Sequence, residues 1–255
     1  MMRFIIIFLA LIMMHNSSLA QTAADEFYDP SEMAKARAAV KSGAGGRMNF
    51  LFLADRLEFQ SGGEGLLNWD TQGWIGGDIN RLWFKSEGEY AFDDNEFEDA
   101  SMELLYGRAI SSYFDLQLGL GQGLEKGPSP TYSIIGIQGL APYWFEIDTN
   151  IMISTKGDIT ASFEAEYDLL FTQKFILQPR LEAGVSLQDI PLYDLGSGLT
   201  DVGLSLRLRY EITKQFSPYI GLTWSQKLGD TADIARLSGE GASNISILFG
   251  LRTWF

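Results

Sequence analysis

The feature that most constrains the fold of this chain is an alternation of apolar and polar residues that starts near residue 47 and continues to the C-terminus. In residues 201–211, for example, Val, three Leu and Tyr alternate with Asp, Gly, Ser, Arg and Glu. Since successive side chains of a β-strand point to opposite faces, this alternation predicts strands with one apolar and one polar face.

The alternation divides into twelve segments, at 47–60, 66–76, 80–90, 98–110, 113–124, 131–140, 144–154, 158–170, 174–188, 199–213, 217–227 and 243–255. These segments are longer than the typical soluble strand of about 5–6 residues. They suit tilted strands of about 9–11 residues or more that cross a bilayer. Short connections, such as 111–112 and 214–215, alternate with longer ones, such as 189–198 and 229–242. The pattern predicts an all-β fold, a transmembrane antiparallel β-barrel of twelve strands in a bacterial outer membrane.

Two further features agree with a membrane barrel. Aromatic residues recur near the ends of the predicted strands, as interfacial girdles require, at Trp83, Tyr106, Tyr113, Tyr143, Trp144, Tyr210, Tyr219, Trp224 and Trp254. An even number of strands places both ends of the barrel on the periplasmic side. The alternative is a soluble β-sandwich or a lipocalin-like barrel, which would turn the apolar face inward and the charged face to water.

The region before the barrel has two parts. Residues 1–20 carry Arg3, an apolar run over 4–14 and a small-x-small site at 18–20, which together predict a secretory signal peptide. Residues 21–46 are predicted to form a short, partly helical periplasmic arm, with an N-cap at Ser31 and a stop at Gly43. Residues 47–255 then form the barrel. The arm is interpreted either as a functional segment or plug, or as a leader without a role.

Composition excludes several functions. The chain has no cysteine, and its single histidine, His15, lies within the predicted signal peptide. Catalysis by a histidine base and zinc sites built on imidazole or thiolate are therefore not expected. The formal net charge of −14 argues against nucleic acid as a partner, because phosphate binding needs a basic surface. We expect the protein not to be an enzyme.

If the apolar face meets lipid, the charged residues between point into the barrel. These predicted lumen residues are Arg56, Glu58, Asp70, Lys85, Glu87, Glu89, Glu103, Glu146, Asp148, Glu164, Glu166, Asp168, Arg180, Glu182, Asp201, Arg207, Arg209 and Glu211. They form either a salt-bridge network that stiffens the barrel or an acid-rich path for metal cations. Among the methionines, Met152 has lumen parity and is a candidate soft metal ligand, with Met48 and Met102 as weaker candidates. Each could equally be a packing residue.

Several longer strings resemble the copper resistance protein B family. They include ADRLEFQ (54–60), WDTQGWIGGDINRLWFKSEGE (69–89), ELLYGRAIS (103–111), FDLQLGLGQGL (114–124) and QGLAPYWFEID (138–148). They continue with EAEYDLLFTQKFILQPRLE (164–182), GSGLTDVGLSLRLRYEI (196–212), FSPYIGLTWSQKLGDTADIAR (216–236) and GLRTWF (250–255). The resemblance covers the predicted barrel, residues 47–255.

The resemblance implies an outer-membrane barrel, surrounded by outer-membrane lipid, that binds copper ions or moves them across the membrane. It also implies a periplasmic multicopper oxidase as a partner. Members of the family often carry a long N-terminal region rich in methionine and histidine. This chain departs from that pattern, since residues 21–46 contain only Met33 and no histidine. A passive structural or pore-type barrel with little copper binding of its own is the alternative.

Overall fold

The computed structural model describes residues 25, 27–43, 47–61, 65–92, 96–124, 129–239 and 241–255. The chain divides into two compact units, Met1–Arg47 and Met48–Phe255. The predicted signal peptide, residues 1–20, lies outside the described residues. None of the helices in the described ranges is long and apolar enough to cross a membrane.

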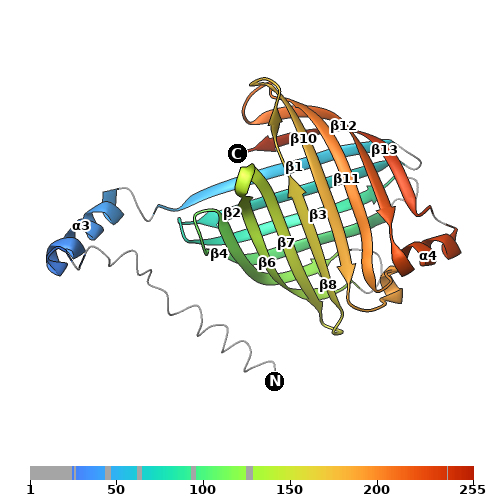
Figure 1. Ribbon diagram of the computed structural model, residues 1–255, viewed down its shortest axis with the longest axis horizontal. Helices are drawn as coiled ribbons and strands as arrows, with labels where there is room; N and C mark the ends of the chain where they lie inside the picture. Colours follow the sequence, from blue (N-terminus) through green and yellow to red (C-terminus); the bar gives the residue numbers. More distant parts are fainter. Residues whose placement is uncertain are drawn as a thin grey trace. The chain divides into compact units, whose positions relative to one another are not determined.

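The second unit is a closed antiparallel β-barrel, and its strands confirm the twelve predicted segments (Figure 1). The strands are β1 (Asn49–Ser61), β2 (Leu66–Gly76), β3 (Asn80–Ala91), β4 (Glu96–Ala109), β5 (Phe114–Gly123), β6 (Thr131–Ala141), β7 (Phe145–Ser154), β8 (Ile159–Glu166), β9 (Leu169–Leu170), β10 (Phe175–Ser186), β11 (Gly198–Tyr210), β12 (Phe216–Lys227) and β13 (Ser243–Trp254). Two 3-10 turns, η2 (Pro142–Trp144) and η3 (Pro191–Tyr193), lie in the connections.

β8 and β9 together form the eighth barrel strand, which is interrupted at Tyr167 and Asp168. The interruption faces Pro179 in the middle of β10, which has no N–H to donate to the neighbouring strand. The Tyr167 N–H still donates to the Pro179 carbonyl at 3.1 Å. The break therefore follows from a proline inside a barrel strand.

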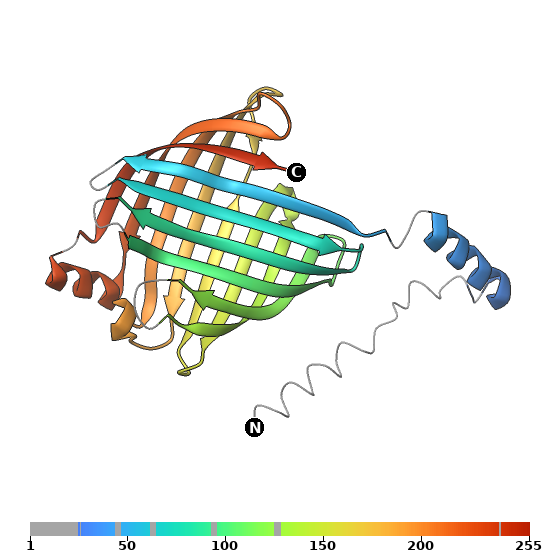
Figure 2. The same cartoon turned by 180° about the vertical axis from the view of Figure 1, so that it is seen from behind.

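The barrel closes between its first and last strands. β13 pairs with β1 as well as β12, and Figure 2 shows them side by side. At the end of the chain, Phe255 and Phe52 exchange two backbone hydrogen bonds of 2.9 and 3.0 Å. Each of β1–β8 and β10–β13 is therefore paired on both sides, as a spanning sheet requires, and among the described strands only the two-residue β9 pairs with a single strand, β10.

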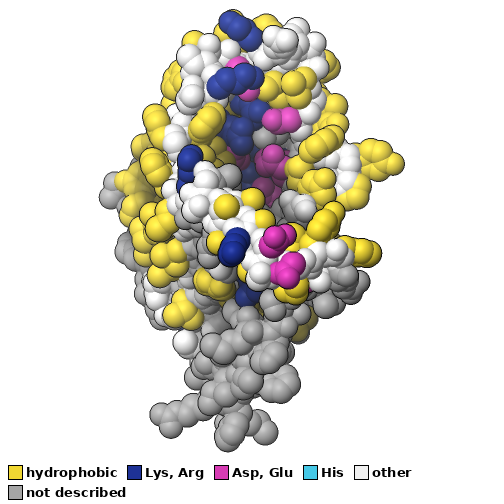
Figure 3. Space-filling view, turned by 90° about the vertical axis from the view of Figure 1, so that its left-hand side faces the viewer, with side chains coloured by type: hydrophobic (Ala, Val, Ile, Leu, Met, Phe, Trp, Pro, Cys, Tyr) yellow, Lys and Arg dark blue, Asp and Glu magenta, His cyan; other side chains and the backbone are white. Residues whose placement is uncertain are grey.

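The outward face of the barrel is apolar, which contradicts the soluble alternative. Large hydrophobic side chains of alternate positions are exposed on every long strand, among them Phe59, Leu104, Ile135, Leu206 and Phe249. Figure 3 looks onto one end and shows charged side chains gathered inside the mouth, with hydrophobic side chains on the flanks. Burying such a surface requires lipid.

Two of the aromatic residues assigned to the girdles were assigned wrongly. Trp83 and Tyr219 are both only 7% exposed and have the parity of the lumen-facing charges. Trp83 packs in an apolar cluster, and the Tyr219 hydroxyl donates to Glu58 at 3.0 Å. Position near a strand end does not specify the face, whereas parity does.

The two α-helices of the described ranges differ in how far the sequence predicted them. α3 (Pro30–Gly43) was expected, but its N-cap is Asp29 and not Ser31. One Asp29 carboxylate oxygen accepts from the N–H groups of Ser31 and Glu32 at 2.7 and 3.3 Å, because Pro30 takes the first helical position. α4 (Gly229–Ser238) lies in a segment predicted to be a loop.

Within the first unit, Arg37 of α3 forms two hydrogen bonds with the carboxylate of Asp25, at 2.7 and 3.1 Å. These bonds raise the pKa of Arg37. Hydrogen bonds from the Ser31 side chain and from the backbone of Ser31 and Glu32 lower the pKa of Asp29.

Candidate functional site: the acidic lumen

A β-bulge in β1 directs two consecutive charged residues into the lumen. The register between β1 and β2 shifts between Ala54 and Arg56, so Asp55 has no partner of its own in β2. Asp55 is buried, and Arg56 bonds to Asp70 and Glu182 at 3.2 Å each. A bulge allows this because the extra residue reverses the alternation of the strand.

Arg180, at the centre of β10, connects the largest set of lumen carboxylates. It is 3% exposed and lies 2.9 Å from Glu182, 3.4 Å from Asp70, 3.7 Å from Asp55 and 3.8 Å from Glu166, and it also pairs with Glu164. We call these six residues the Arg180 network. Several of its acids are direct neighbours across strands, such as Glu164 and Glu182, so the arginine offsets their mutual repulsion.

In a second group of lumen charges, three arginines each form an ion pair with one carboxylate. Arg207 donates two hydrogen bonds of 3.0 Å to the two oxygens of Glu58, which also accepts from Tyr219. Arg209 pairs with Asp168 at 2.6 Å, and Arg252 pairs with Asp55. These pairs, of which Arg207–Glu58 is bidentate, join different strands of the barrel and favour the structural role predicted for part of the lumen charge.

A third group crosses the lumen from the side of β2 and β3 to the side of β6 and β7. The Lys85 ammonium lies 2.6 Å from Asp148, whose other carboxylate oxygen accepts from Asn150 at 2.9 Å. In parallel, Gln138 donates to Gln72 at 3.0 Å. Both bonds join strands that are not neighbours in the sheet.

On the lumen side of β2–β7, an apolar cluster fills part of the interior. Trp83, Leu105 and Ile134 form its buried centre, and Trp74, Tyr132 and Met152 pack against them. The cluster depends on Gly107, where an added Cβ would lie 2.5 Å from the Trp83 indole nitrogen. Met152 therefore has apolar neighbours as well as lumen parity.

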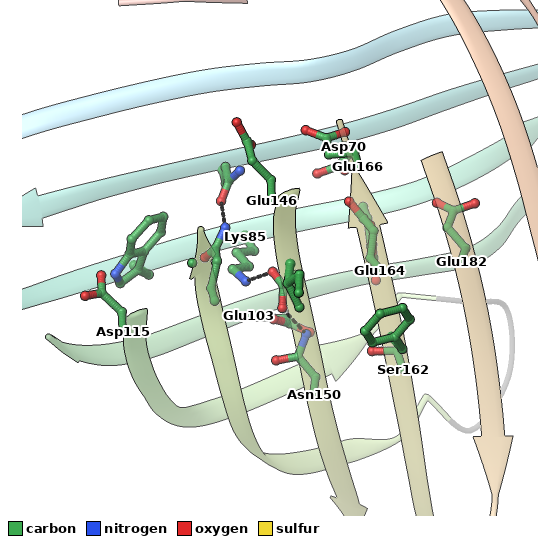
Figure 4. Close-up of a pocket in the computed structure, with 18 of the residues that line it drawn as sticks. Asp70, Lys85, Glu103, Asp115, Glu146, Asn150, Ser162, Glu164, Glu166 and Glu182 are labelled. Atoms are coloured by element: carbon green, nitrogen blue, oxygen red, sulfur yellow. Dashed lines mark hydrogen bonds and ion pairs between the residues drawn. The ribbon is translucent and has the colours of Figure 1, made fainter. Parts of the chain in front are cut away.

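The remaining lumen is a cavity of about 870 Å³ with a strongly acidic lining (Figure 4). In the part of the chain that the structure describes, its lining contains two cationic side chains, Arg81 and Lys85. Twelve carboxylates line it: Asp55, Asp70, Asp78, Glu87, Glu103, Asp115, Glu146, Asp148, Glu164, Glu166, Glu182 and Asp201. Among the described residues, no group of three or more carboxylates is arranged to hold a metal ion.

The structure thus distributes the predicted site residues over several places. The predicted residues that line the cavity are Asp70, Lys85, Glu87, Glu103, Glu146, Asp148, Met152, Glu164, Glu166, Glu182 and Asp201. Arg56, Glu58, Arg180, Arg207 and Arg209 lie in the ion pairs behind or beside it. Glu211 follows the end of β11 and pairs with Lys214 at 2.8 Å. Met48 precedes β1 and is 73% exposed, and Met102 lies on the outward face, 45% exposed. Neither of these two methionines accompanies Met152 in the cavity lining.

Five charged residues of the lumen were missed by the sequence reasoning, and one of them, Asp78, lies in the connection between β2 and β3, where strand parity gives no signal. Arg81 and Asp115 pair at 2.7 Å. Arg81 has the parity of the predicted lumen residues Lys85 and Glu87, so its signal was available, whereas no residue of β5 had been predicted to face the lumen. Arg252 has the parity of Gly250 and Leu248 in β13. Asp55 gave no such signal. By sequence parity it belongs with Leu57 and Phe59, which face outward, and only the bulge turns it into the lumen.

Taken together, a closed barrel with an apolar belt and a charged lumen defines an outer-membrane β-barrel protein. The fold is shared with the NanC porin, with a TM-score of 0.51 and 11% identity over 80% of this chain and 99% of that one. At this level of identity, the likeness shows the fold alone.

The family follows from sequence similarity. Residues 48–255 match the family model described as "Copper resistance protein B precursor". The chain is 41% identical over 209 residues to copper resistance protein B of Escherichia coli, covering 82% of this chain and 70% of that protein. It is 42% identical, with the same coverage, to a copper resistance protein B homolog of Pseudomonas syringae pv. tomato. The chain belongs to the copper resistance protein B family, and its barrel lies in the outer membrane.

Proposed function

We propose that this barrel contributes to copper resistance by taking copper ions into its acidic lumen, where it binds them or lets them cross the outer membrane. The observation that carries the proposal is the cavity lining, with its twelve carboxylates and two cationic side chains. A narrow, low-dielectric space lined by one sign of charge concentrates ions of the opposite sign. Copper is the cargo in this proposal, and the protein has no catalytic role.

The proposal includes the organisation of the whole chain. Residues 1–20 would be a signal peptide, residues 21–46 a short periplasmic arm and residues 47–255 the barrel, in contact with outer-membrane lipid. A periplasmic multicopper oxidase would be the partner that acts on the copper. With Met33 as its only methionine, the arm offers at most one soft ligand.

The test is copper tolerance of a strain that lacks this protein. The wild-type chain should restore growth on copper, and a Glu87→Gln/Glu146→Gln variant should restore it less well. Both glutamates line the cavity, and neither makes an ion pair within the described ranges. An Asp194→Asn/Asp233→Asn variant is the matched control, because it removes two carboxylates that do not line the cavity. Equal growth with all three chains would contradict the proposal.

The candidate soft ligand Met152 has its own test. Met152→Leu keeps most of the side-chain volume against the apolar cluster but removes the thioether. If the sulfur binds Cu(I), the variant loses Cu(I) affinity while its stability stays close to that of the wild type. If Met152 only packs, Cu(I) binding is unchanged in Met152→Leu.

The passive alternative also rests on an observation. The Arg180 network and the Arg207–Glu58 pair bind much of the lumen charge to other protein groups. A structural barrel would show this pairing without any copper phenotype. The wild-type barrel could be folded and present in the outer membrane and yet fail to restore growth on copper. That result would favour the passive alternative.

A further inference from the structure

Lys85 occupies an unusual position between two carboxylates of the cavity. In the register of β3 and β4, Lys85 lies directly opposite Glu103. Its ammonium nevertheless extends to Asp148 on β7, at 2.6 Å. All three side chains line the cavity, and Figure 4 shows Lys85 and Glu103 close to each other in it.

Glu103 is left without a partner by this arrangement. It is only 8% exposed, and its carboxylate makes no hydrogen bond or ion pair within the part of the chain that the structure describes. A buried carboxylate without a counter-ion is costly, so Glu103 favours a cation near it. The unpaired carboxylate of Glu103 points to a ligand, and it does so independently of the number of acids in the lumen.

The charges of these groups fit one divalent ion. When both carboxyls are ionised, Lys85, Glu103 and Asp148, which we call the Lys85 site, carry one positive and two negative charges. If the ammonium left, the two carboxylates would balance one divalent cation. Asn150 holds Asp148 in place through a hydrogen bond of 2.9 Å, so the carboxylate is positioned independently of Lys85. Oxygen donors of this kind suit Cu(II) better than Cu(I).

We propose that Lys85 is a tethered cation that takes the place of a divalent cation between Asp148 and Glu103, and that an incoming divalent ion displaces it. This inference rests on the proposed function for its choice of ion, and it adds the residue that controls occupancy of the lumen.

The test is equilibrium binding of Cu²⁺, added as a simple salt, to the refolded full chain in detergent, measured by calorimetry. Lys85→Gln should bind Cu²⁺ more tightly than the wild type, by roughly tenfold to a thousandfold, since a like charge within a few ångströms has been removed. Glu103→Gln in the Lys85→Gln background should abolish the gain. Asp148→Asn alone should bring no gain in Cu²⁺ affinity. Lys85→Leu, which removes the charge without adding a sulfur ligand, replaces Lys85→Gln if that variant fails to fold.

Arg81→Gln is the matched control. It removes the other cationic side chain of the cavity lining. The partner of Arg81 is Asp115, at 2.7 Å, and not Glu103. Unchanged Cu²⁺ binding in Lys85→Gln would overturn the inference, and so would an equal gain in Arg81→Gln, which would show only a general effect of lumen charge. Copper tolerance is scored separately. Tolerance that depends on the chain, without a gain in Lys85→Gln, contradicts the inference and leaves the proposed function in place. A gain in Cu²⁺ affinity in Lys85→Gln, without copper tolerance that depends on the chain, contradicts the proposed function alone.

Discussion

Replacing Arg180 should destabilise the barrel more than replacing any cation with one partner. The guanidinium is 3% exposed and lies within 2.9–3.8 Å of four carboxylates, besides its contact with Glu164. At an effective dielectric constant of ~20, each such pair attracts with about 4–6 kcal/mol before desolvation and repulsion among the acids are counted. Arg180→Met would leave these carboxylates without their shared counter-ion, and we expect a loss of about 3–5 kcal/mol in the free energy of unfolding.

The measurement is urea unfolding of the barrel in lipid vesicles, followed by tryptophan fluorescence and by the mobility of the unheated protein on gels. Arg81→Met is the control, because Arg81 has one carboxylate partner and a side chain that is 27% exposed, and it should cost about 1 kcal/mol. Adding Glu164→Gln to Arg180→Met should restore part of the lost stability. If Arg180→Met and Arg81→Met are equally stable, or if Glu164→Gln brings no recovery, the network is not a charge balance and this reasoning is refuted.

Three further predictions concern other parts of the chain. The helicity of a peptide covering residues 25–43 should fall as the pH drops below about 4. The pKa of Asp29 is lower in the helix than in the unfolded segment, so its capping is complete above the unfolded value and is lost as pH falls through the folded one. Circular dichroism measures this, and Asp29→Asn should remove the step. Gly107→Val should destabilise the barrel by about 1–3 kcal/mol, since its Cβ would lie 2.5 Å from Trp83, and Gly203→Ala, with its nearest contact at 3.2 Å from a flexible side chain, should cost less in the same urea titration. Leu206→Arg, on the lipid face, should cost about 2–4 kcal/mol in vesicles, and a smaller loss would contradict the assigned face.

The faces of the strands could be predicted because side-chain alternation is a property of the backbone. The twelve segments and the inward direction of residues such as Glu103, Asp148 and Arg180 follow from it. The same rule explains its failure at Asp55. A bulge changes the phase within a strand, and the string ADRLEFQ gives no local signal of the bulge.

α4 shows a different limit. Its N-cap position is Leu228, which provides no capping side chain, so the usual sign of a helix start is missing. The helix is held by tertiary contacts instead. Thr231, Ala232 and Ala235 are buried, and Thr231 accepts a hydrogen bond of 2.9 Å from the N–H of Gly196. No local pattern in this segment contains those contacts.

Ion-pair partners lie further beyond the sequence than faces do. Glu58 and Arg207 are 149 positions apart, and their bidentate contact depends on the closure of the barrel between β13 and β1. The sequence predicted that both face the lumen, and it left open whether they would bind each other or an ion. Parity gives a list of candidates, while register decides which of them meet.

Trp83 and Lys85 show why the lumen could be predicted as a charged space but not as the divided space that it is. They are two positions apart on β3 and face the same interior, yet Trp83 lies among apolar residues and Lys85 among acids. The difference comes from the next strand, where register places Leu105 opposite Trp83 and Glu103 opposite Lys85. Each row of paired residues across the sheet therefore has its own polarity, and the boundary between the apolar cluster and the acidic cavity runs between two such rows. Lys85 lies at that boundary, and we therefore assign the proposed control of occupancy to this residue and not to Arg180, whose charge is already shared among five acids.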